Sequence, residues 1–183
     1  FILTIIAALS FGFVLYSDDE RGGIRKTTDD SARNYTTIGS IGLTVTNFGT
    51  LGTRNAYWPE QPSCEYPRGS RIEHIYQGGL WVGAELRSAS PLRDGLRVVS
   101  TGSHDGVSTT TGKGFEFTSL VGTVVTQRST LSDSRYFDLN AISHQDFVSE
   151  YNDVIPRDST EPDRSVPMFL RVKQESYAWN FPF

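Results

Sequence analysis

The sequence predicts a mainly β protein: an antiparallel β-sandwich preceded by an apolar N-terminal helix and a polar arm. Three observations predict this class. The 183 residues suit one domain with an appendage. Strand-favouring residues recur in short runs separated by Gly, Ser, Asp and Pro. The chain also opens with one continuous apolar run. We therefore expect an apolar helix over 1–17, a polar linker over 18–35 and a β-sandwich domain over 36–183.

Short alternating runs define the expected strands of that domain. Alternation within 36–47 places Ile41, Leu43 and Val45 on one face. The Gly78-Gly79 pair predicts a turn or bulge beside an aromatic strand. The strands are expected within 36–47, 74–86, 96–101, 114–118, 121–128 and 167–181.

Two later stretches have a different character. Residues 140–151 leave room for a short helix. Residues 152–166 contain two prolines and mixed charges, which predicts a surface loop. We find no internal repeat.

Charge and cysteine content limit the functions open to the chain. The net charge is −4, and acidic and basic residues are interspersed, so no basic face for nucleic acid is expected. Cys64 is the single cysteine, which excludes a disulfide within the chain. Its thiol is either buried as a small apolar group or paired with another chain, and free cysteines are more often buried.

The apolar run from Phe1 to Tyr16 stops against Asp18, Asp19 and Glu20. As a helix it would span about 24 Å, less than the roughly 30 Å of a hydrocarbon core. Three interpretations stay open: a secretory signal peptide, a retained anchor that contacts the membrane through residues 1–16, and an assembly helix buried among copies of the chain. The first residue is Phe1 rather than Met, with no basic stretch before the run, which favours the assembly segment.

A phenylalanine at position 1 followed by an apolar run resembles type IV pilins. Ile5 departs from that pattern, because those pilins usually carry Glu there, and their apolar run is longer. The resemblance implies self-association into a homopolymer. The expected assembly segment consists of Phe1, Ile2, Leu3, Ile5, Ile6, Leu9, Phe11, Phe13, Val14 and Leu15.

Four blocks resemble a second family. They are GLTVTNFGTLG (42–52), YWPEQPSCEYP (57–67), EHIYQGGLWVG (73–83) and SYAWNFPF (176–183). In this order they are similar to a region of large secreted or cell-surface bacterial proteins that use the type IX export route. There the blocks follow a signal peptide and precede further domains. The resemblance covers 38–183 and implies export and β structure, but no activity. The chain departs from that family by ending at Phe183.

No catalytic constellation stands out. Ser103, His104 and Asp105 are the residue types of a hydrolase triad, but adjacent side chains diverge, so this segment predicts a turn. The three histidines, His74, His104 and His144, lack zinc-ligand spacing, although Asp105 and Asp146 are near two of them in sequence.

Acidic and aromatic residues suggest two further kinds of site. Glu65 and Glu73 flank an aromatic stretch. This pattern suggests either glycoside hydrolysis by the two carboxylates or stacking of sugar rings on Trp58 and Trp81. A group of acidic residues in loops could bind calcium, but their spacing matches no standard calcium-binding loop, so we assign no ligands. Those acids are Asp18, Asp19, Glu20, Asp153, Asp158, Glu161 and Asp163. Asn34-Tyr35-Thr36 is a glycosylation sequon.

We therefore expect a non-catalytic, secreted or cell-surface structural subunit of a filament, assembled through the N-terminal apolar segment. No cofactor is expected. The alternative is an accessory or adhesive β module of a larger secreted protein, with residues 1–17 as its signal peptide.

Overall fold

The computed structural model describes residues 3–6, 10–17, 31–52, 60–87, 94–103, 115–154 and 167–181. These residues form thirteen strands and no helix. Every pair of strands among them is antiparallel. The mainly β, antiparallel class is therefore confirmed.

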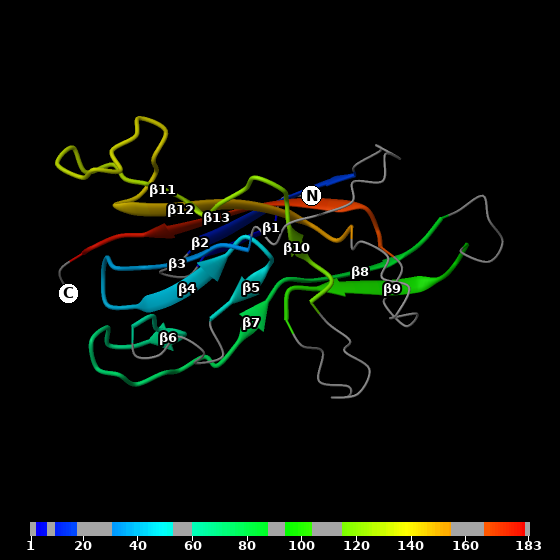
Figure 1. Cartoon of the computed structure of the whole chain (residues 1–183), viewed down its shortest axis with the longest axis horizontal. Helices are drawn as coiled ribbons and strands as arrows, with labels where there is room; N and C mark the ends of the chain where they lie inside the picture. Colours follow the sequence, from blue (N-terminus) through cyan, green and yellow to red (C-terminus); the bar gives the residue numbers. More distant parts are fainter. Residues whose placement is uncertain are drawn as a thin grey trace.

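The largest sheet, which we call the long sheet, is centred on β12 (Gln145–Asn152) and β13 (Leu170–Ala178). These two strands pair in register over eight residues. The strand order is β1-β2-β13-β12-β10, and β11 also pairs with β12 (Figure 1). The shorter members are β1 (Leu3–Ile6), β2 (Ser10–Ser17), β10 (Thr118–Ser119) and β11 (Thr126–Arg128).

Shorter strands form a second sheet beneath the long one (Figure 1). Its order is β3-β4-β5-β7, and β6 pairs with β4. The strands are β3 (Arg33–Tyr35), β4 (Gly42–Thr46), β5 (Thr50–Leu51), β6 (Cys64–Glu65) and β7 (Gly78–Gly79). We call it the short-strand sheet. It begins inside the predicted linker, because β3 pairs with β4 from Arg33 onward.

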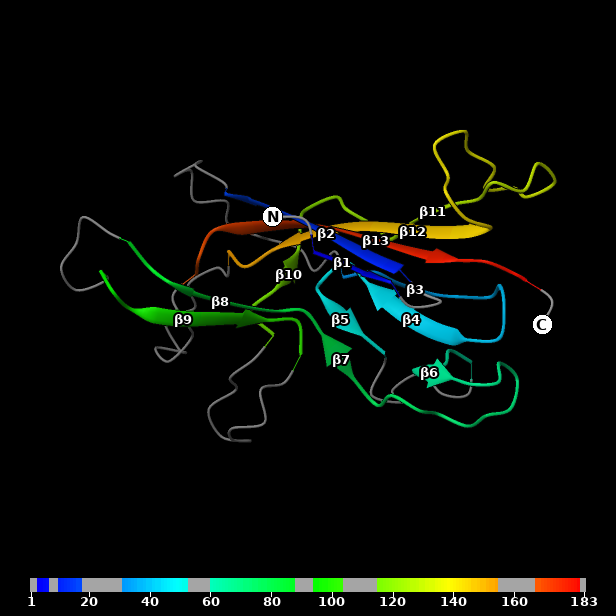
Figure 2. The same cartoon turned by 180° about the vertical axis from the view of Figure 1, so that it is seen from behind.

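The third sheet has two strands, β8 (Trp81–Glu85) and β9 (Arg97–Thr101). Seen from either side, this ribbon extends away from the other two sheets (Figures 1 and 2). Most side chains of β8 are exposed, whereas β9 alternates between exposed and buried positions up to Ser100.

Five of the six predicted segments contain the strand expected in them, and 114–118 meets β10 only at Thr118. The short helix allowed over 140–151 is wrong, because β12 occupies Gln145–Asn152. Its side chains alternate between two faces, and Phe147, Ser149 and Tyr151 are buried on the inner one. That period of two is the pattern of a strand.

The apolar N-terminal helix is also not what the structure shows. Leu3–Ile6 and Ser10–Ser17 are strands β1 and β2, which pair with each other, and β2 also pairs with β13 from Leu170 to Tyr177. The run is rich in isoleucine, phenylalanine and other β-branched or aromatic residues, which favour strands. The edge of β13 also offers backbone groups that a helix would leave unpaired.

The inner face of the long sheet packs against the short-strand sheet through both apolar and polar groups. Phe147 and Val172 are buried on this face. The Ser149 hydroxyl donates to the carbonyl of Thr46 at 3.0 Å, and the backbone N–H of Thr37 donates to Gln145 Oε1 at 2.8 Å. These bonds satisfy polar groups that would be costly to bury alone. They also fix how the two layers lie relative to each other.

An aromatic cluster joins the ribbon to the two layers. Phe117 and Tyr151 meet edge to face with ring centroids 5.3 Å apart, and Val172 completes the buried group. Leu80 and Val82, at the root of the ribbon, pack against it. The Tyr151 hydroxyl donates to Gln174 at 3.0 Å. Burial raises the pKa of Tyr151, so this hydroxyl stays protonated.

Three glycines make a close backbone junction beside this cluster. Gly49 has a positive φ of 76°, and its carbonyl accepts the N–H of Leu80 at 3.2 Å. A Cβ on Gly102 would lie 1.9 Å from that carbonyl oxygen, and one on Gly79 would lie 2.7 Å from the carbonyl carbon of Gly102. Only glycine fits this junction. Gly78 and Gly79 form strand β7, where a turn or bulge was predicted.

Candidate functional site

The residues suggested for triad or zinc chemistry are not brought together where the structure describes them. Ser103 accepts a hydrogen bond from Trp81 Nε1 at 2.9 Å, and His104 and Asp105 lie outside the described residues. The ring of His74 bonds the carbonyl of Tyr66, and that of His144 bonds the backbone N–H of Asn180. No group of three or more His, Cys, Asp or Glu side chains within the described ranges is arranged to hold a metal ion.

Glu65 and Glu73 stabilise the loop around Cys64. The carboxylate of Glu65 accepts the backbone N–H groups of Gly69, at 2.9 Å, and of Arg71. The carboxylate of Glu73 accepts the backbone N–H groups of Ser63, at 3.0 Å, and of Cys64, at 2.6 Å. The two backbone hydrogen bonds hold the pKa of Glu65 below its ordinary value. Both carboxylates are thus engaged with the backbone, which is a structural use.

The thiol of Cys64 is buried in strand β6. Burial raises its pKa, and the nearby charge of Glu73 raises it further. A thiol with a raised pKa is a poor nucleophile, because the thiolate is the reactive form. The expected burial of Cys64 is what the structure shows.

Asp153 connects three parts of the chain. Its side chain is fully buried. The carboxylate accepts the hydroxyl of Ser100 at 2.8 Å and the backbone N–H groups of Met168 and Leu170 at 2.8 and 2.7 Å. It therefore links β9 to the start of β13. The other acids raised for calcium, Asp18, Asp19, Glu20, Asp158, Glu161 and Asp163, lie outside the described residues, as does Trp58.

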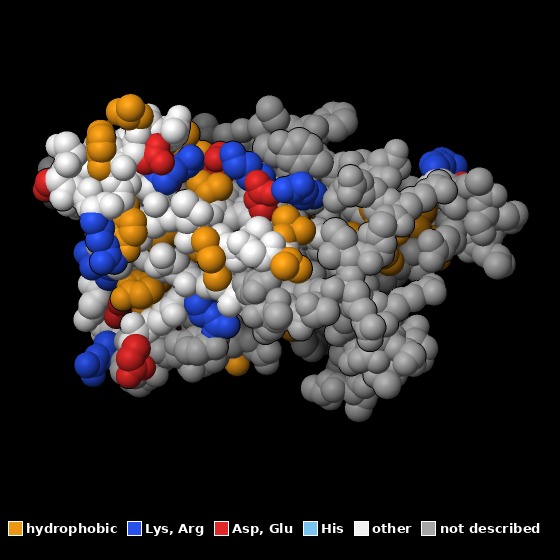
Figure 3. All heavy atoms as spheres, turned by 45° about the horizontal axis from the view of Figure 1, so that its top comes forward, with side chains coloured by type: hydrophobic (Ala, Val, Ile, Leu, Met, Phe, Trp, Pro, Cys, Tyr) orange, Lys and Arg blue, Asp and Glu red, His pale blue; other side chains and the backbone are white. Residues whose placement is uncertain are grey.

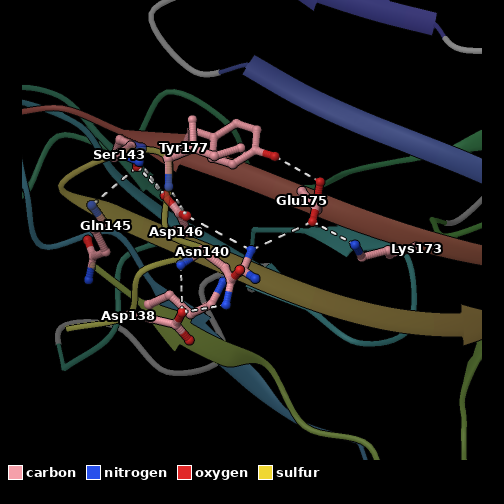
Figure 4. Close-up of polar contacts among 11 residues, drawn as sticks. Asp138, Asn140, Ser143, Gln145, Asp146, Lys173, Glu175 and Tyr177 are labelled. Atoms are coloured by element: carbon pink, nitrogen blue, oxygen red, sulfur yellow. Dashed lines mark hydrogen bonds and ion pairs between the residues drawn. The ribbon is translucent and has the colours of Figure 1, made fainter. Parts of the chain in front are cut away.

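The densest polar cluster lies on the outer face of the long sheet (Figure 4). Asp146 is fully buried and accepts the N–H of Ile142 at 2.7 Å and both the N–H and the hydroxyl of Ser143 at 2.8 and 2.5 Å. Arg128 approaches Asp146 at 3.9 Å and Glu175 at 3.7 Å. Arg128 thus bridges two strands of the sheet.

Glu175 is the second centre of this cluster. Lys173 lies 2.8 Å from its carboxylate, and the Tyr177 hydroxyl donates to it at 2.8 Å. Burial alone would raise the pKa of Glu175, but these partners outweigh burial and lower it. The pKa of Tyr177 is raised by burial and then by Glu175. These contacts favour the charged form of the Glu175 carboxylate and the protonated form of the Tyr177 hydroxyl.

Opposite charges alternate further along the same face, where Arg171 meets Glu150 at 2.7 Å. Figure 3 shows acidic and basic side chains next to one another there, with single hydrophobic side chains between them. A face of alternating charge presents no one-signed field to a ligand.

Aromatic residues extend β13 beyond its last paired residue. Trp179 and Phe181 stack with centroids 6.5 Å apart and planes 11° from parallel, and Tyr177 lies 6.2 Å from Trp179. His144 lies 6.0 Å from Phe181, which is 60% exposed. This row was not predicted as a site, although its residues lie within the 176–183 block. The alternation of aromatic residues at 177, 179 and 181 is the signal that predicts it.

The described part of the expected assembly segment forms strands β1 and β2 at one end of the long sheet. Leu3, Ile5 and Ile6 belong to β1, and Phe11, Phe13, Val14 and Leu15 belong to β2. Phe1, Ile2 and Leu9 lie outside the described residues. No helix in the described part of the chain is long and apolar enough to cross a membrane.

No family model, curated protein or solved structure matches this chain.

Proposed function

We propose that the chain is a non-catalytic, secreted or cell-surface structural subunit that assembles through its N-terminal apolar segment, with its two sheet layers forming a β-sandwich. The observation that carries this proposal is the pairing of β2 with β13 over eight residues. A backbone ladder of that length can join an apolar segment to a sheet edge without a helix. The mode of attachment is therefore strand addition, in place of the helix burial expected from the pilin resemblance.

The use of polar side chains supports a structural role. Glu65, Glu73, Asp146 and Asp153 all bind backbone N–H groups of their own chain. Carboxylates used in this way position loops and strands and are not free to act on a substrate. We propose no cofactor, and the type IX export route remains a proposal for how such a module would leave the cell.

Electron microscopy of natively purified protein tests the assembly proposal. We expect regular filaments from the full chain and dispersed particles from a chain lacking residues 1–17. Circular dichroism of the shortened chain is the control, because its β content must persist for the comparison to hold. Dispersed particles from the full chain would contradict the proposal. Mass spectrometry of exported protein that shows residues 1–17 removed would favour an export signal.

An adhesive β module is the second candidate, favoured by its exposed aromatic residues. Trp81 is 54% exposed on the ribbon, and Trp179 and Phe181 form an aromatic row. Flat aromatic surfaces suit the apolar faces of sugar rings. Tryptophan fluorescence titration with oligosaccharides tests this candidate. A saturable change that is lost in Trp179→Ala but kept in Trp81→Ala would locate binding at the row, and no change at all would exclude sugar binding there.

A further inference from the structure

The edge of β13 that faces β2 is an acceptor for one strand. On its other side β13 pairs with β12 along its length. On this side the partner is β2, from Leu170 opposite Ser17 to Tyr177 opposite Ser10. Without it, eight residues of β13 would present an open edge. Such edges recruit strands from other chains.

Strand β2 fills this edge of β13, and its pairing with β13 attaches it to the rest of the fold. Among the described strands, β2 pairs only with β1 and β13. β1 pairs only with β2, so the two form a hairpin whose strand pairing to the rest of the molecule is one ladder. A hairpin held by a single ladder can be supplied by any copy of the chain, because the backbone contacts would be identical.

The connection from β2 to the remaining fold is a thirteen-residue stretch. Residues 18–30 separate β2 from the next described segment. Thirteen residues reach at most about 45 Å when extended. The stretch contains Gly22-Gly23 and mixed charges, with Ile24 as its one large aliphatic residue. Its sequence therefore supplies little apolar surface to keep β2 on its own copy.

We infer that β2 of one copy pairs with β13 of a second copy, and this inference rests on the proposed assembly function. Each copy then carries one donor strand and one acceptor edge. A head-to-tail contact of this kind does not close on itself unless the geometry returns to the start, so it propagates as an open chain. The occupant of the edge is residues 10–17 of a neighbouring subunit.

Cysteine pairs placed across the ladder distinguish the two arrangements. Val14 and Lys173 are register partners, and paired residues in an antiparallel ladder lie within disulfide reach. In a Cys64→Ser background, one chain carries only Val14→Cys and a second carries only Lys173→Cys. The two full-length chains are mixed, unfolded, refolded together and oxidised. A disulfide between them requires β2 of one chain to lie on β13 of the other.

A third chain with Glu150→Cys is the matched control. Glu150 pairs with Lys173 across β12 and β13, so it is one strand farther from Val14. We expect at least ten-fold more mixed disulfide with Lys173→Cys than with Glu150→Cys. A mixed disulfide of equal yield with both partners would reflect random collision and would overturn the inference.

A fourth chain carries both Val14→Cys and Lys173→Cys. This chain can form its disulfide within one copy or between two copies. If it forms only the disulfide within one copy and still assembles into filaments, strand exchange is overturned while the assembly function stands. If it closes internally and the full chain is monomeric, both fail. If no disulfide forms in any combination, β2 does not occupy this edge, which also overturns the inference.

Discussion

The long sheet and the ribbon differ in what holds them. In the long sheet, both faces of β12 and β13 are engaged: the inner face packs on the short-strand sheet, and the outer face carries the cluster of Asp146, Arg128 and Glu175. The ribbon exposes one face, where Trp81 and Val99 are 54% and 46% exposed. Its charged residues form ion pairs that are themselves largely exposed, such as Arg97 with Glu85 at 3.8 Å.

This difference indicates where sequence changes will cost stability. Buried polar groups with several partners are expensive to disturb, because removal of one leaves the others unsatisfied. Exposed ion pairs contribute little, because water and salt screen them. The root of the ribbon is the exception, since the glycine junction lies there.

The largest effect is expected at that junction. In Gly102→Ala the new Cβ would lie 1.9 Å from the carbonyl oxygen of Gly49, so the backbone must shift. We expect a loss of about 3 kcal/mol or more in the free energy of unfolding, measured by urea denaturation. Gly83→Ala is the matched control within the ribbon, because its Cβ would meet no neighbour closer than 3.8 Å. Equal losses in both variants would contradict the claim that the close backbone contact makes Gly102 the more sensitive position.

The next effect concerns the outer cluster of the long sheet. Asp146→Ala removes the acceptor of three hydrogen bonds and leaves Arg128 without that partner. We expect a loss of about 2 kcal/mol in the free energy of unfolding. Glu85→Ala, which removes a carboxylate from the exposed face of the ribbon, should cost less than about 0.5 kcal/mol. A loss from Glu85→Ala as large as that from Asp146→Ala would break the contrast between the two regions.

A smaller effect on the free energy of unfolding is expected at low pH, where Glu65 becomes protonated. The folded state lowers the pKa of Glu65 below its ordinary 4.5 through backbone hydrogen bonds. A lowered pKa means that its contribution to stability is present above about pH 4.5 and is lost as pH falls through the folded-state value. Glu65→Gln should therefore weaken the fall in stability between pH 5 and about pH 3, measured by denaturation at each pH. An unchanged slope, with Glu85→Gln as the control, would show that Glu65 does not couple to folding.

The smallest effect on stability, with a clear chemical readout, concerns Cys64. Because the thiol is buried and its pKa is raised, we expect it to react with a thiol reagent only as slowly as the protein opens. Val99→Cys in a Cys64→Ser background places a thiol on the exposed face of the ribbon and should react at least a hundred-fold faster. Cys64→Ser alone should leave assembly intact. Rapid labelling of native Cys64, or a loss of assembly in Cys64→Ser, would contradict burial.

Alternation in the sequence predicted the strands that use it regularly. Met168, Leu170 and Val172 alternate with Phe169, Arg171 and Lys173 in the sequence, which is why a strand was expected within 167–181, and β13 covers Leu170–Ala178. The same period predicted β4, although both of its faces are buried. Strand β12 was missed because Gln145 and Ser149 are polar residues on its inward face and Val148 is an apolar residue on its outward face, so apolar and polar residues do not alternate regularly.

Features that depend on long-range contacts could not be predicted. Gly49, Gly79 and Gly102 lie far apart in the chain, and only the fold shows that their backbones meet. The preference of the N-terminal run for strands was present in its isoleucine and phenylalanine content, but an apolar run of this length fits helix and strand equally. Partners such as Asp153 with Ser100, 53 positions apart, carry no local signal at all.

The glycine junction separates the orientation of the ribbon from its surface chemistry. The ribbon meets the two layers through direct backbone contacts at Gly102 and Leu80, whose N–H groups bind the carbonyls of Leu80 and Gly49. Positions such as Val99 and Arg97 can then diverge among descendants of this sequence without changing the angle at which the ribbon projects. The exposed face of the ribbon can therefore accept new side chains, and with them new contacts, without a change in the framework beneath.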